Sequence, residues 1–475
     1  MRGAPRPSGA ELTADVVDLD QDGRGVARVD GKVTFIRGAL PGERVRYRLY
    51  RHGKQADEGL MDAVEQASPD RAEPRCAHFG VCGGCSLQHL SEPGQRAFKQ
   101  KQLLDALQRI GKVQPEQVAP PIAGPGWGYR RRARLSVKHV AKKGGVLVGF
   151  READSPYVAQ LDSCVVLDPR VGLKLKALAE CVGRLNINTL VPQIEVAAAE
   201  TVALVFRVMQ APTPEDREIL RAFGEQHGFE IYLQPGGLDT IAPLAGATPL
   251  TLSPDGRELK LTFRPTDFVQ VNDSVNQQMV RQALDWLSGD PGGEADGHGA
   301  DGREAGPALA PDAPTHRRKG RFGQAPLRGL RVLELFCGLG NFSLPLAKAG
   351  AEVTAVESER GLVERARQNA AANGLAIRFE QADLFTPDAR VDWLRQPYDA
   401  VLVDPPRAGA REVLPVVADG KPQRLVYVSC HPGTLARDAA FLVHERGYRL
   451  ERAGILDMFP HTRHVESMAL FVRNS

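Results

Sequence analysis

The decisive stretch of the sequence is Leu425-Val-Tyr-Val-Ser-Cys430-His-Pro-Gly-Thr-Leu435, an apolar run that ends at a cysteine and continues into a turn. The apolar and β-branched residues before Cys430 predict a buried strand, and the His-Pro-Gly turn predicts the start of a helix. Cys430 is therefore expected at the carboxyl end of a strand. In an open α/β sheet that edge is where ligands bind. A cysteine there is either a small core residue or a nucleophile.

The alternation of strands and helices extends outward from this stretch. Strands are expected at 331–335, 352–357, 376–379, 398–404 and 425–430, with 448–457 and 465–472 as a closing antiparallel pair. This pattern predicts a C-terminal α/β doubly wound sheet, assigned to a domain of residues 263–475. Residues 288–326 are rich in Gly and Pro and poor in large apolar side chains, so they are predicted to be a disordered insertion.

Two acidic residues indicate a nucleoside pocket at the same edge of the sheet. The loop Phe336-Cys-Gly-Leu-Gly-Asn341 lacks the full G-x-G-x-x-G spacing, which argues against a pyrophosphate cofactor. Glu357 ends the second strand, where a carboxylate can accept hydrogen bonds from two ribose hydroxyls. Asp383 follows the third strand, where an adenine edge would lie. The arrangement favours S-adenosylmethionine.

A nucleophile and a base can be assigned around that pocket. C5 of uracil is a poor nucleophile toward a sulfonium methyl group, but addition of a Cys430 thiolate at C6 gives C5 enolate character. The thiolate must be partly deprotonated near pH 7, which the helix N-terminus and basic surroundings would favour. Asp404, after the neighbouring strand, can hydrogen-bond the uracil. Glu466 is the leading candidate for the base that removes the C5 proton, with His431 and His464 as alternatives.

A cluster of cysteines indicates a metal centre in a central α+β domain, residues 67–262. Cys76, Cys82 and Cys85 lie in one short segment with two glycines, and a fourth thiolate would complete the set. Cys164 is the leading candidate for that ligand, and Cys181, inside an expected helix, is the alternative. Structural zinc sites usually pair two C-x-x-C motifs, and this segment has one. The pattern favours a [4Fe–4S] cluster and leaves zinc open.

Two basic segments are candidates for nucleic-acid contact. Residues 1–66 alternate short β-runs with turns, which predicts a small OB-like barrel. Arg44, Arg46 and Arg48 would share one face of a strand, either as a solvated face or as a phosphate-contacting surface. The stretch 128–143 carries Lys and Arg without an acid, which favours nucleic-acid binding.

The composition bounds the remaining possibilities. The chain has 475 residues, 42% hydrophobic and 25% charged, which suits several globular domains. The formal net charge is +3, so any nucleic-acid surface must be a local patch. Neither a secretory signal nor a bilayer-spanning run is evident, so a cytoplasmic protein without a membrane partner is expected. We expect a monomer with no obligate protein partner.

On these residues the chain resembles the RNA uracil-C5 methyltransferase family, from Thr13 to Val472. Within the family it is most similar to the enzymes that modify uridine 1939 of 23S ribosomal RNA. The resemblance implies a TRAM barrel, S-adenosylmethionine, a [4Fe–4S] cluster and 23S ribosomal RNA as substrate. It implies catalytic roles for Cys430 and Glu466, cofactor contacts for Gln270 of the F-x-Q-x-N motif, Phe336, Asn341, Glu357, Asp383 and Asp404, and cluster ligation by Cys76, Cys82, Cys85 and Cys164.

Other functions stay open on the residues alone. Asp404-Pro-Pro resembles the D-P-P-[YF] motif of base-amino methyltransferases, although Arg407 replaces the aromatic residue. A non-catalytic RNA-binding or iron–sulfur sensor protein would leave Cys430 as a core residue. Within the family, the enzyme for another ribosomal uridine usually lacks the barrel, and the tRNA enzyme lacks both the barrel and the cluster cysteines. Those two features favour 23S RNA.

Overall fold

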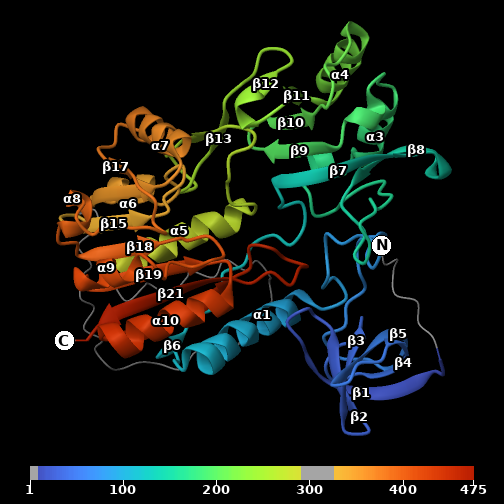
Figure 1. Ribbon diagram of the computed structural model, residues 1–475, viewed down its shortest axis with the longest axis horizontal. Helices are drawn as coiled ribbons and strands as arrows, with labels where there is room; N and C mark the ends of the chain where they lie inside the picture. The colour runs from blue at the N-terminus through green and yellow to red at the C-terminus, as the bar shows by residue number, and fades with distance from the viewer. Residues whose placement is uncertain (1–8, 290–325, 475) are drawn as a thin grey trace, which may run out of the picture.

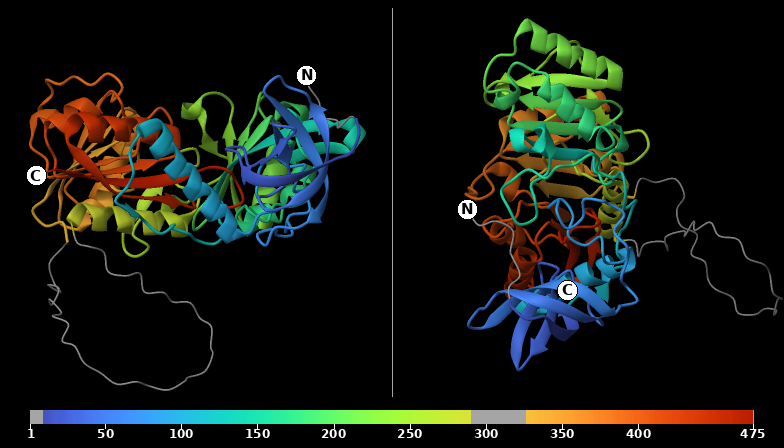
Figure 2. Two further views of the ribbon diagram at one scale, coloured as in Figure 1. Left: turned by 90° about the horizontal axis from the view of Figure 1, so that it is seen from below. Right: turned by 90° about the vertical axis from the view of Figure 1, so that its right-hand side faces the viewer.

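The computed structural model describes residues 9–289 and 326–474, which form a barrel, a central sheet and a C-terminal α/β unit (Figure 1). Figure 2 shows the α/β unit at one end of the molecule and the barrel and central sheet at the other. The insertion predicted at 288–326 lies outside the described residues except at its ends. Among the residues described, no helix is long and apolar enough to cross a membrane.

The N-terminal unit is a closed barrel of five strands in the order β1-β2-β3-β5-β4, as the sequence predicts. Its strands are β1 (Leu12–Leu19), β2 (Gly25–Val29), β3 (Lys32–Arg37), β4 (Arg44–Arg51) and β5 (Ala56–Gln66). Along β4, Val45, Tyr47 and Leu49 point into the core, because side chains alternate between the faces of a strand. Closure leaves the sheet without a free edge.

The arginines on the outer face of β4 are paired with acids of the same barrel. Arg46 Nη1 lies 3.0 Å from a carboxylate oxygen of Glu11, and Arg48 Nε lies 2.8 Å from one of Asp62. Arg44 faces Asp15 at 3.4 Å. The structure therefore favours the solvated face over a phosphate-contacting surface at this strand.

The central unit is a six-stranded sheet in the order β12-β11-β10-β9-β7-β8, flanked by helices. The strands are β7 (Arg132–Val140), β8 (Gly145–Gly149), β9 (Gln193–Ala198), β10 (Val202–Arg207), β11 (Phe229–Gln234) and β12 (Ala242–Pro243). The helices are α2 (Pro169–Gly172), α3 (Leu175–Gly183) and α4 (Pro214–His227), with 3-10 turns at Ala141–Lys143, Asn188–Leu190 and Leu238–Thr240. Residues 150–167 mostly form loops around the cysteine segment, and Cys181, the alternative metal ligand, is buried in the core of α3 and the sheet.

The C-terminal unit is an eight-stranded sheet in the order β17-β16-β15-β18-β19-β21-β20-β6. Its parallel strands are β15 (Arg331–Leu335), β16 (Glu352–Glu357), β17 (Arg378–Gln381), β18 (Ala400–Val403) and β19 (Arg424–Ser429), and β20 (Tyr448–Leu456) and β21 (Glu466–Arg473) form the predicted antiparallel pair. Helices α5 (Asp273–Ser288), α6 (Ser343–Lys348) and α7 (Arg360–Ala372) cover one face, and α8 (Asp392–Arg395), α9 (Leu414–Asp419) and α10 (Pro432–Arg446) contribute to the core on the other. A hairpin of β13 (Leu250–Leu252) and β14 (Leu261–Phe263) leads into this unit.

Two elements from the N-terminal half of the chain complete this C-terminal sheet. Strand β6 (Gln117–Val118) pairs in parallel with β20, and helix α1 (Glu92–Ala106), continued by a π-helical turn at Leu107–Gly111, packs on α10 and β20 (Figure 1). The helix is capped by Ser91, whose Oγ accepts a hydrogen bond from the N–H of Gly94. Leu103 and Leu107 are buried, whereas Ile110 is exposed.

Candidate active site

A cavity of about 570 Å³ lies at the carboxyl ends of β15, β16, β18 and β19. Seven of the eight catalytic and cofactor residues predicted from the sequence line it: Gln270, Phe336, Asn341, Glu357, Asp404, Cys430 and Glu466. They come from segments far apart in the chain, because parallel strands present their carboxyl ends at one edge. The cavity is mainly apolar with a few convergent polar groups, which is typical of a small-molecule site.

One end of the cavity is formed by the loop after β15 and the end of β16. Phe336 has a φ of 64°, a conformation that is rare for a bulky residue and clusters at functional sites. Its ring lies 5.9 Å from that of Phe385, so two aromatic rings face this end. Glu357 Oε2 accepts a hydrogen bond of 3.2 Å from the N–H of Gly338. This end suits a flat, hydrogen-bonding nucleoside.

Asn341 is held by a partner that the sequence analysis did not identify. Asn276 of α5 and Asn341 exchange two amide hydrogen bonds of 2.9 and 3.0 Å. Asn272, at the end of the F-x-Q-x-N motif, caps the same helix by accepting a bond from the N–H of Val275. The motif therefore orients α5 toward the loop after β15. The only sequence signal for Asn276 is its place one helical turn after that motif.

Asp383 is the one predicted cofactor residue that does not line the cavity. Its carboxylate accepts hydrogen bonds of 2.9 Å from the N–H of Phe385 and the hydroxyl of Thr386, so it caps its own turn. These bonds lower its pKa, the bond from Phe385 most strongly. The neighbouring residues Leu384 and Phe385 line the cavity instead.

Three ionisable groups meet at the other end of the cavity. Cys430 follows β19, Asp404 follows β18, and Glu466 begins β21. Burial raises the pKa of Asp404 to about 7, and burial together with the charge of Asp404 raises the pKa of Glu466 to about 8. Arg407 and Lys99 partly oppose the shift at Glu466. A carboxyl group with a pKa near the working pH is suited to general base catalysis.

The pKa of the Cys430 thiol is raised, whereas the sequence predicted a lowered pKa. Burial, and then the charges of Glu466 and Asp404, raise its pKa to about 11. Helix α10 does begin beside it, and Arg407 acts in the opposite direction, but desolvation dominates. In the free protein the thiol is therefore protonated near neutral pH.

The two histidines considered as alternative bases do not line the cavity. His431 Nδ1 accepts a hydrogen bond of 3.2 Å from the N–H of Thr434 and caps α10. His464 lines a neighbouring cleft rather than the cavity. Of the three candidate bases, Glu466 lies in the cavity with Cys430.

The four predicted metal ligands line one small pocket between the cysteine segment and the loop before α2. Gly84 donates its N–H to Cys82 Sγ at 3.4 Å, and backbone N–H groups of Val166 and Leu167 point at Cys164 Sγ. Burial raises the pKa of Cys82 to about 11. In residues 9–289 and 326–474 no three His, Cys, Asp or Glu side chains form a group that could hold a metal ion.

Comparison with known proteins identifies the family. Residues 327–474 match the model of the family described as tRNA (uracil-5-)-methyltransferase, and residues 5–49 match the TRAM domain. A 23S rRNA (uracil(1939)-C(5))-methyltransferase of Stenotrophomonas maltophilia is 45% identical over 476 residues, which cover 99% of both chains. The chain belongs to the RNA uracil-C5 methyltransferase family. Enzymes of the same name from Alkalilimnicola ehrlichii and Acidithiobacillus ferrooxidans are 47% and 48% identical, over 97% and 96% of this chain and 96% of each relative.

A solved structure confirms the fold of this uracil-C5 methyltransferase. The tRNA (uracil-54, C5)-methyltransferase of Pyrococcus abyssi, in complex with S-adenosyl-L-homocysteine, superposes with a TM-score of 0.68 at 23% identity. The match covers 97% of this chain and 100% of the other. The predicted barrel and α/β methyltransferase fold are thus confirmed, with the barrel a TRAM domain.

Two further clefts adjoin the cavity of this methyltransferase. One, of about 880 Å³, lies between the barrel, the cysteine segment and the loop before β21, and Phe459 lines both it and the cavity. It is lined by four arginines and three phenylalanines: Arg24, Arg37, Arg130, Arg463, Phe79, Phe150 and Phe459.

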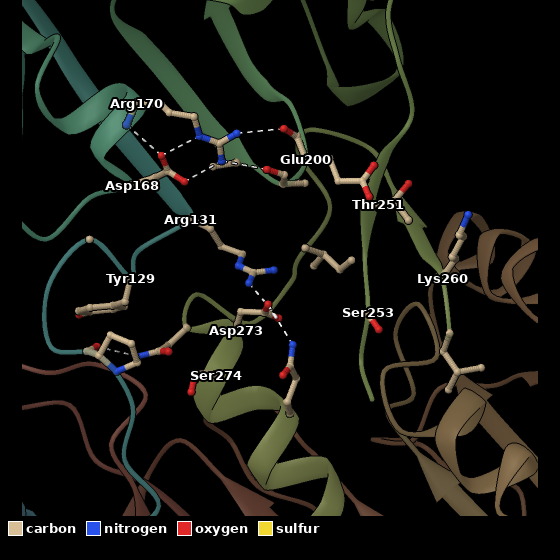
Figure 3. A pocket seen from close by; sticks show the side chains of 18 of the residues that line it. Tyr129, Arg131, Asp168, Arg170, Glu200, Thr251, Ser253, Lys260, Asp273 and Ser274 are labelled. Carbon is tan, nitrogen blue, oxygen red and sulfur yellow. Dashed lines mark hydrogen bonds and ion pairs between the residues drawn. The ribbon is translucent and has the colours of Figure 1, made fainter. Parts of the chain in front are cut away.

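The other cleft, of about 660 Å³, lies between the central sheet and α5 (Figure 3). In it Arg131 pairs with Asp273 at 2.9 Å, and Arg170 pairs with Asp168 at 2.7 Å. Arg134 pairs with Glu195 nearby at 3.1 Å. Part of the basic stretch predicted at 128–143 is therefore used in internal ion pairs.

Proposed function

We propose that this protein methylates C5 of one uridine in 23S ribosomal RNA, at the position equivalent to uridine 1939, using S-adenosylmethionine. The observation that carries the proposal is the meeting of Cys430, Asp404 and Glu466 at one end of a cavity whose other end suits a nucleoside. The names of the 45–48% identical relatives support the choice of substrate. The TRAM barrel supports an RNA substrate.

The cofactor end of the cavity fits S-adenosylmethionine. Glu357 would hold the ribose hydroxyls, and Phe336 and Phe385 would enclose the adenine. Gln270 and Asn341 are the polar groups available to the amino-acid part. When bound, S-adenosylmethionine supplies a methyl group on a positively charged sulfur. Asp383 lies outside this set, so we propose for it only a role in shaping the turn that carries Phe385.

Cys430 acts as the nucleophile in the proposed reaction. Its sulfur forms a bond to C6 of the uracil, and the electron pair of the C5–C6 double bond moves to C5. C5 then takes the methyl group from the sulfonium, the electrons of the broken S–CH₃ bond stay on that sulfur, and S-adenosylhomocysteine leaves. The thiol must lose its proton first, and its raised pKa makes this unfavourable in the free protein. Asp404 at the same end is placed to hydrogen-bond the uracil ring and fix C6 over the sulfur.

Glu466 completes the reaction as the base. Its carboxylate removes the C5 proton, the C–H electron pair restores the C5–C6 double bond, and Cys430 leaves C6 with its electrons. A raised pKa of about 8 keeps this carboxylate basic enough to accept the proton. A base-amino methyltransferase would need neither Cys430 nor this elimination step.

The arginine- and phenylalanine-lined cleft is the proposed path of the RNA next to the target base. It opens on the cavity at Phe459 and combines aromatic rings with arginines, the two features that bind single-stranded nucleic acid. Arg37 and Arg463 are paired there with Asp154 and Asp22, so RNA phosphates would have to compete with these acids. A flipped-out uridine would enter the cavity while its neighbours occupy the cleft. The barrel and the central sheet would thereby serve substrate binding, and the C-terminal α/β unit, which α1 and β6 from the expected central domain 67–262 complete, would serve the chemistry.

We also propose that Cys76, Cys82, Cys85 and Cys164 hold a [4Fe–4S] cluster. All four thiols line one pocket, and backbone N–H groups point at two of the sulfurs. The ligands of a cluster bind different irons, so they stand farther apart than four ligands of one zinc ion. Anaerobically purified protein should be brown and contain iron, and a colourless, zinc-loaded, active protein would contradict the cluster.

The function is tested by incubating the protein with 23S ribosomal RNA and labelled S-adenosylmethionine and mapping the methylated nucleotide. We expect one 5-methyluridine, absent with Cys430→Ala and retained with the matched control Cys181→Ala in the core. RNA containing 5-fluorouracil should form a covalent adduct at Cys430, since the C5 fluorine cannot be removed as a proton. Methylation by Cys430→Ala, or of tRNA alone, would overturn the proposal.

A further inference from the structure

Lys99 of α1 is fully buried. Its exposed fraction is 0%, and its ammonium donates hydrogen bonds to Asp457 Oδ1 at 2.7 Å and to the carbonyl of Phe459 at 2.8 Å. A buried lysine is rare and requires partners. Nothing in the reaction described above uses it.

Both partners of Lys99 lie in the turn that leads to the proposed base. Asp457 directly follows β20, and Leu456, its neighbour, is paired in register with Glu466 at the start of β21. Phe459 and Glu466 line the same cavity. Lys99 therefore holds the start of this turn. Its bonds reach Asp457, which follows the strand paired with Glu466, and Phe459, whose side chain lines the cavity.

A second residue on the same face of α1 holds the other half of this turn. Gln95 lies one helical turn before Lys99. Its amide carbonyl accepts a bond of 2.7 Å from the N–H of His461, and its NH₂ group lies 3.2 Å from His461 Nδ1. His461 has a φ of 65°, a strained conformation that these contacts maintain. Helix α1 thus forms hydrogen bonds with the turn through two side chains, Lys99 and Gln95.

We propose that Lys99 is a positioning residue for the proton-removal step: it fixes the turn of residues 457–464 and places a buried positive charge beside Glu466. This inference rests on the proposed function, because it assigns Glu466 the role of base. Lys99 does not touch the substrate and acts through Glu466 and the turn.

The positive charge of Lys99 changes the pKa of the proposed base, Glu466, in a known direction. The charged and titratable groups that act on Glu466 are Asp404 from the end of β18, Arg407 from the following loop, Cys430 from the end of β19 and Lys99 from α1. Burial and Asp404 raise the pKa of Glu466, whereas Arg407 and Lys99 lower it. Without Lys99 more of Glu466 would hold a proton at neutral pH and could not accept another.

A purely structural role would predict a different outcome. A buried ion pair contributes little net stability, and replacing both partners by apolar residues is often neutral, whereas removing one partner leaves a buried charge. The double variant Lys99→Met/Asp457→Leu therefore removes both charges of the pair and leaves no unpaired buried charge. Lys99→Gln removes only the positive charge and leaves a shorter side chain whose amide can still donate hydrogen bonds. Lys101→Met, an exposed neighbour paired with Asp18 and Asp105, is the control.

The experiment measures breakdown of the methylated Cys430–RNA adduct after rapid mixing, with quenching at several pH values between 6 and 9. In the wild-type protein the rate should rise with pH as Glu466 ionises. In Lys99→Gln the midpoint should move to higher pH and the step at pH 7 should slow, whereas in the double variant, which also removes the negative charge of Asp457, the shift should be smaller. The KM for RNA should stay unchanged, and Lys99→Arg should restore most of the rate.

The outcomes separate this inference from the proposed function. A wild-type midpoint in Lys99→Gln, measured on folded protein, overturns the role of Lys99 and leaves the function intact. A shift of equal size in Lys101→Met also overturns it. If the wild-type protein forms no adduct at Cys430, the proposed function is wrong. The role of Lys99, which depends on that function, is then wrong as well.

Discussion

Replacement of Glu466 by glutamine tests the assignment of the base most directly. The amide keeps the size of the side chain and cannot accept the C5 proton. With a pKa of about 8, only about one tenth of the Glu466 side chains are ionised at pH 7. The wild-type elimination rate should therefore rise about ten-fold between pH 7 and pH 9. The rate rises rather than falls because the base must be deprotonated to accept the C5 proton.

In Glu466→Gln that rise should disappear, and the step should slow by roughly 10² to 10⁴-fold, the usual contribution of a general base. Methyl transfer precedes proton removal, so a labelled methyl group should accumulate on RNA bound covalently to Cys430. The assay is a denaturing gel of protein mixed with labelled S-adenosylmethionine and RNA, followed over time. If Glu466→Gln turned over at the wild-type rate, or made no adduct while still folded, Glu466 would not be the base.

Three further predictions concern other parts of the structure. Asn341→Ala should leave the amide of Asn276 unpaired and weaken binding of S-adenosylhomocysteine by about 1–2 kcal/mol in calorimetry; unchanged affinity would remove Asn341 from the cofactor site. The free energy of unfolding should fall as pH rises from about 5 toward 8, because buried Glu334 has a pKa of about 8 and in the folded protein keeps a proton that the unfolded chain releases. Glu334→Gln should flatten this slope in denaturant titrations. Arg46→Ala should leave RNA affinity within two-fold in filter binding, because Arg46 is already paired with Glu11.

Strand ends were the most predictable part of the site. Cys430, Asp404 and Glu357 could be placed from the sequence, because apolar runs locate parallel strands and the chemistry gathers at their carboxyl ends. Asp383 shows the limit of that rule. Strand β17 is short, and the loop after it turns so that Phe385 enters the cavity while Asp383 caps the turn.

Burial and long-range pairing were the less predictable part. The basic pattern of β4 left a solvated face and a phosphate-contacting surface open, and only the structure shows that Glu11, Asp15 of β1 and Asp62 of β5 pair with its arginines. Lys99 lies in a helix whose polar residues suggested exposure, and only the docking of α1 on β20 buries it. The pKa of Cys430 depends on desolvation by several segments, which local sequence does not encode.

The docking of α1 on the end of β20 also determines when α1 can reach its final contacts during synthesis of the chain. Lys99 and Asp457 are 358 residues apart. At about 5–20 residues per second, the partner of Lys99 leaves the ribosome roughly 20 to 70 seconds after it. During that interval Leu103 and Leu107, which belong to the core of the C-terminal sheet, have no sheet to cover them. The nascent chain therefore exposes this part of α1 until the last hairpin emerges.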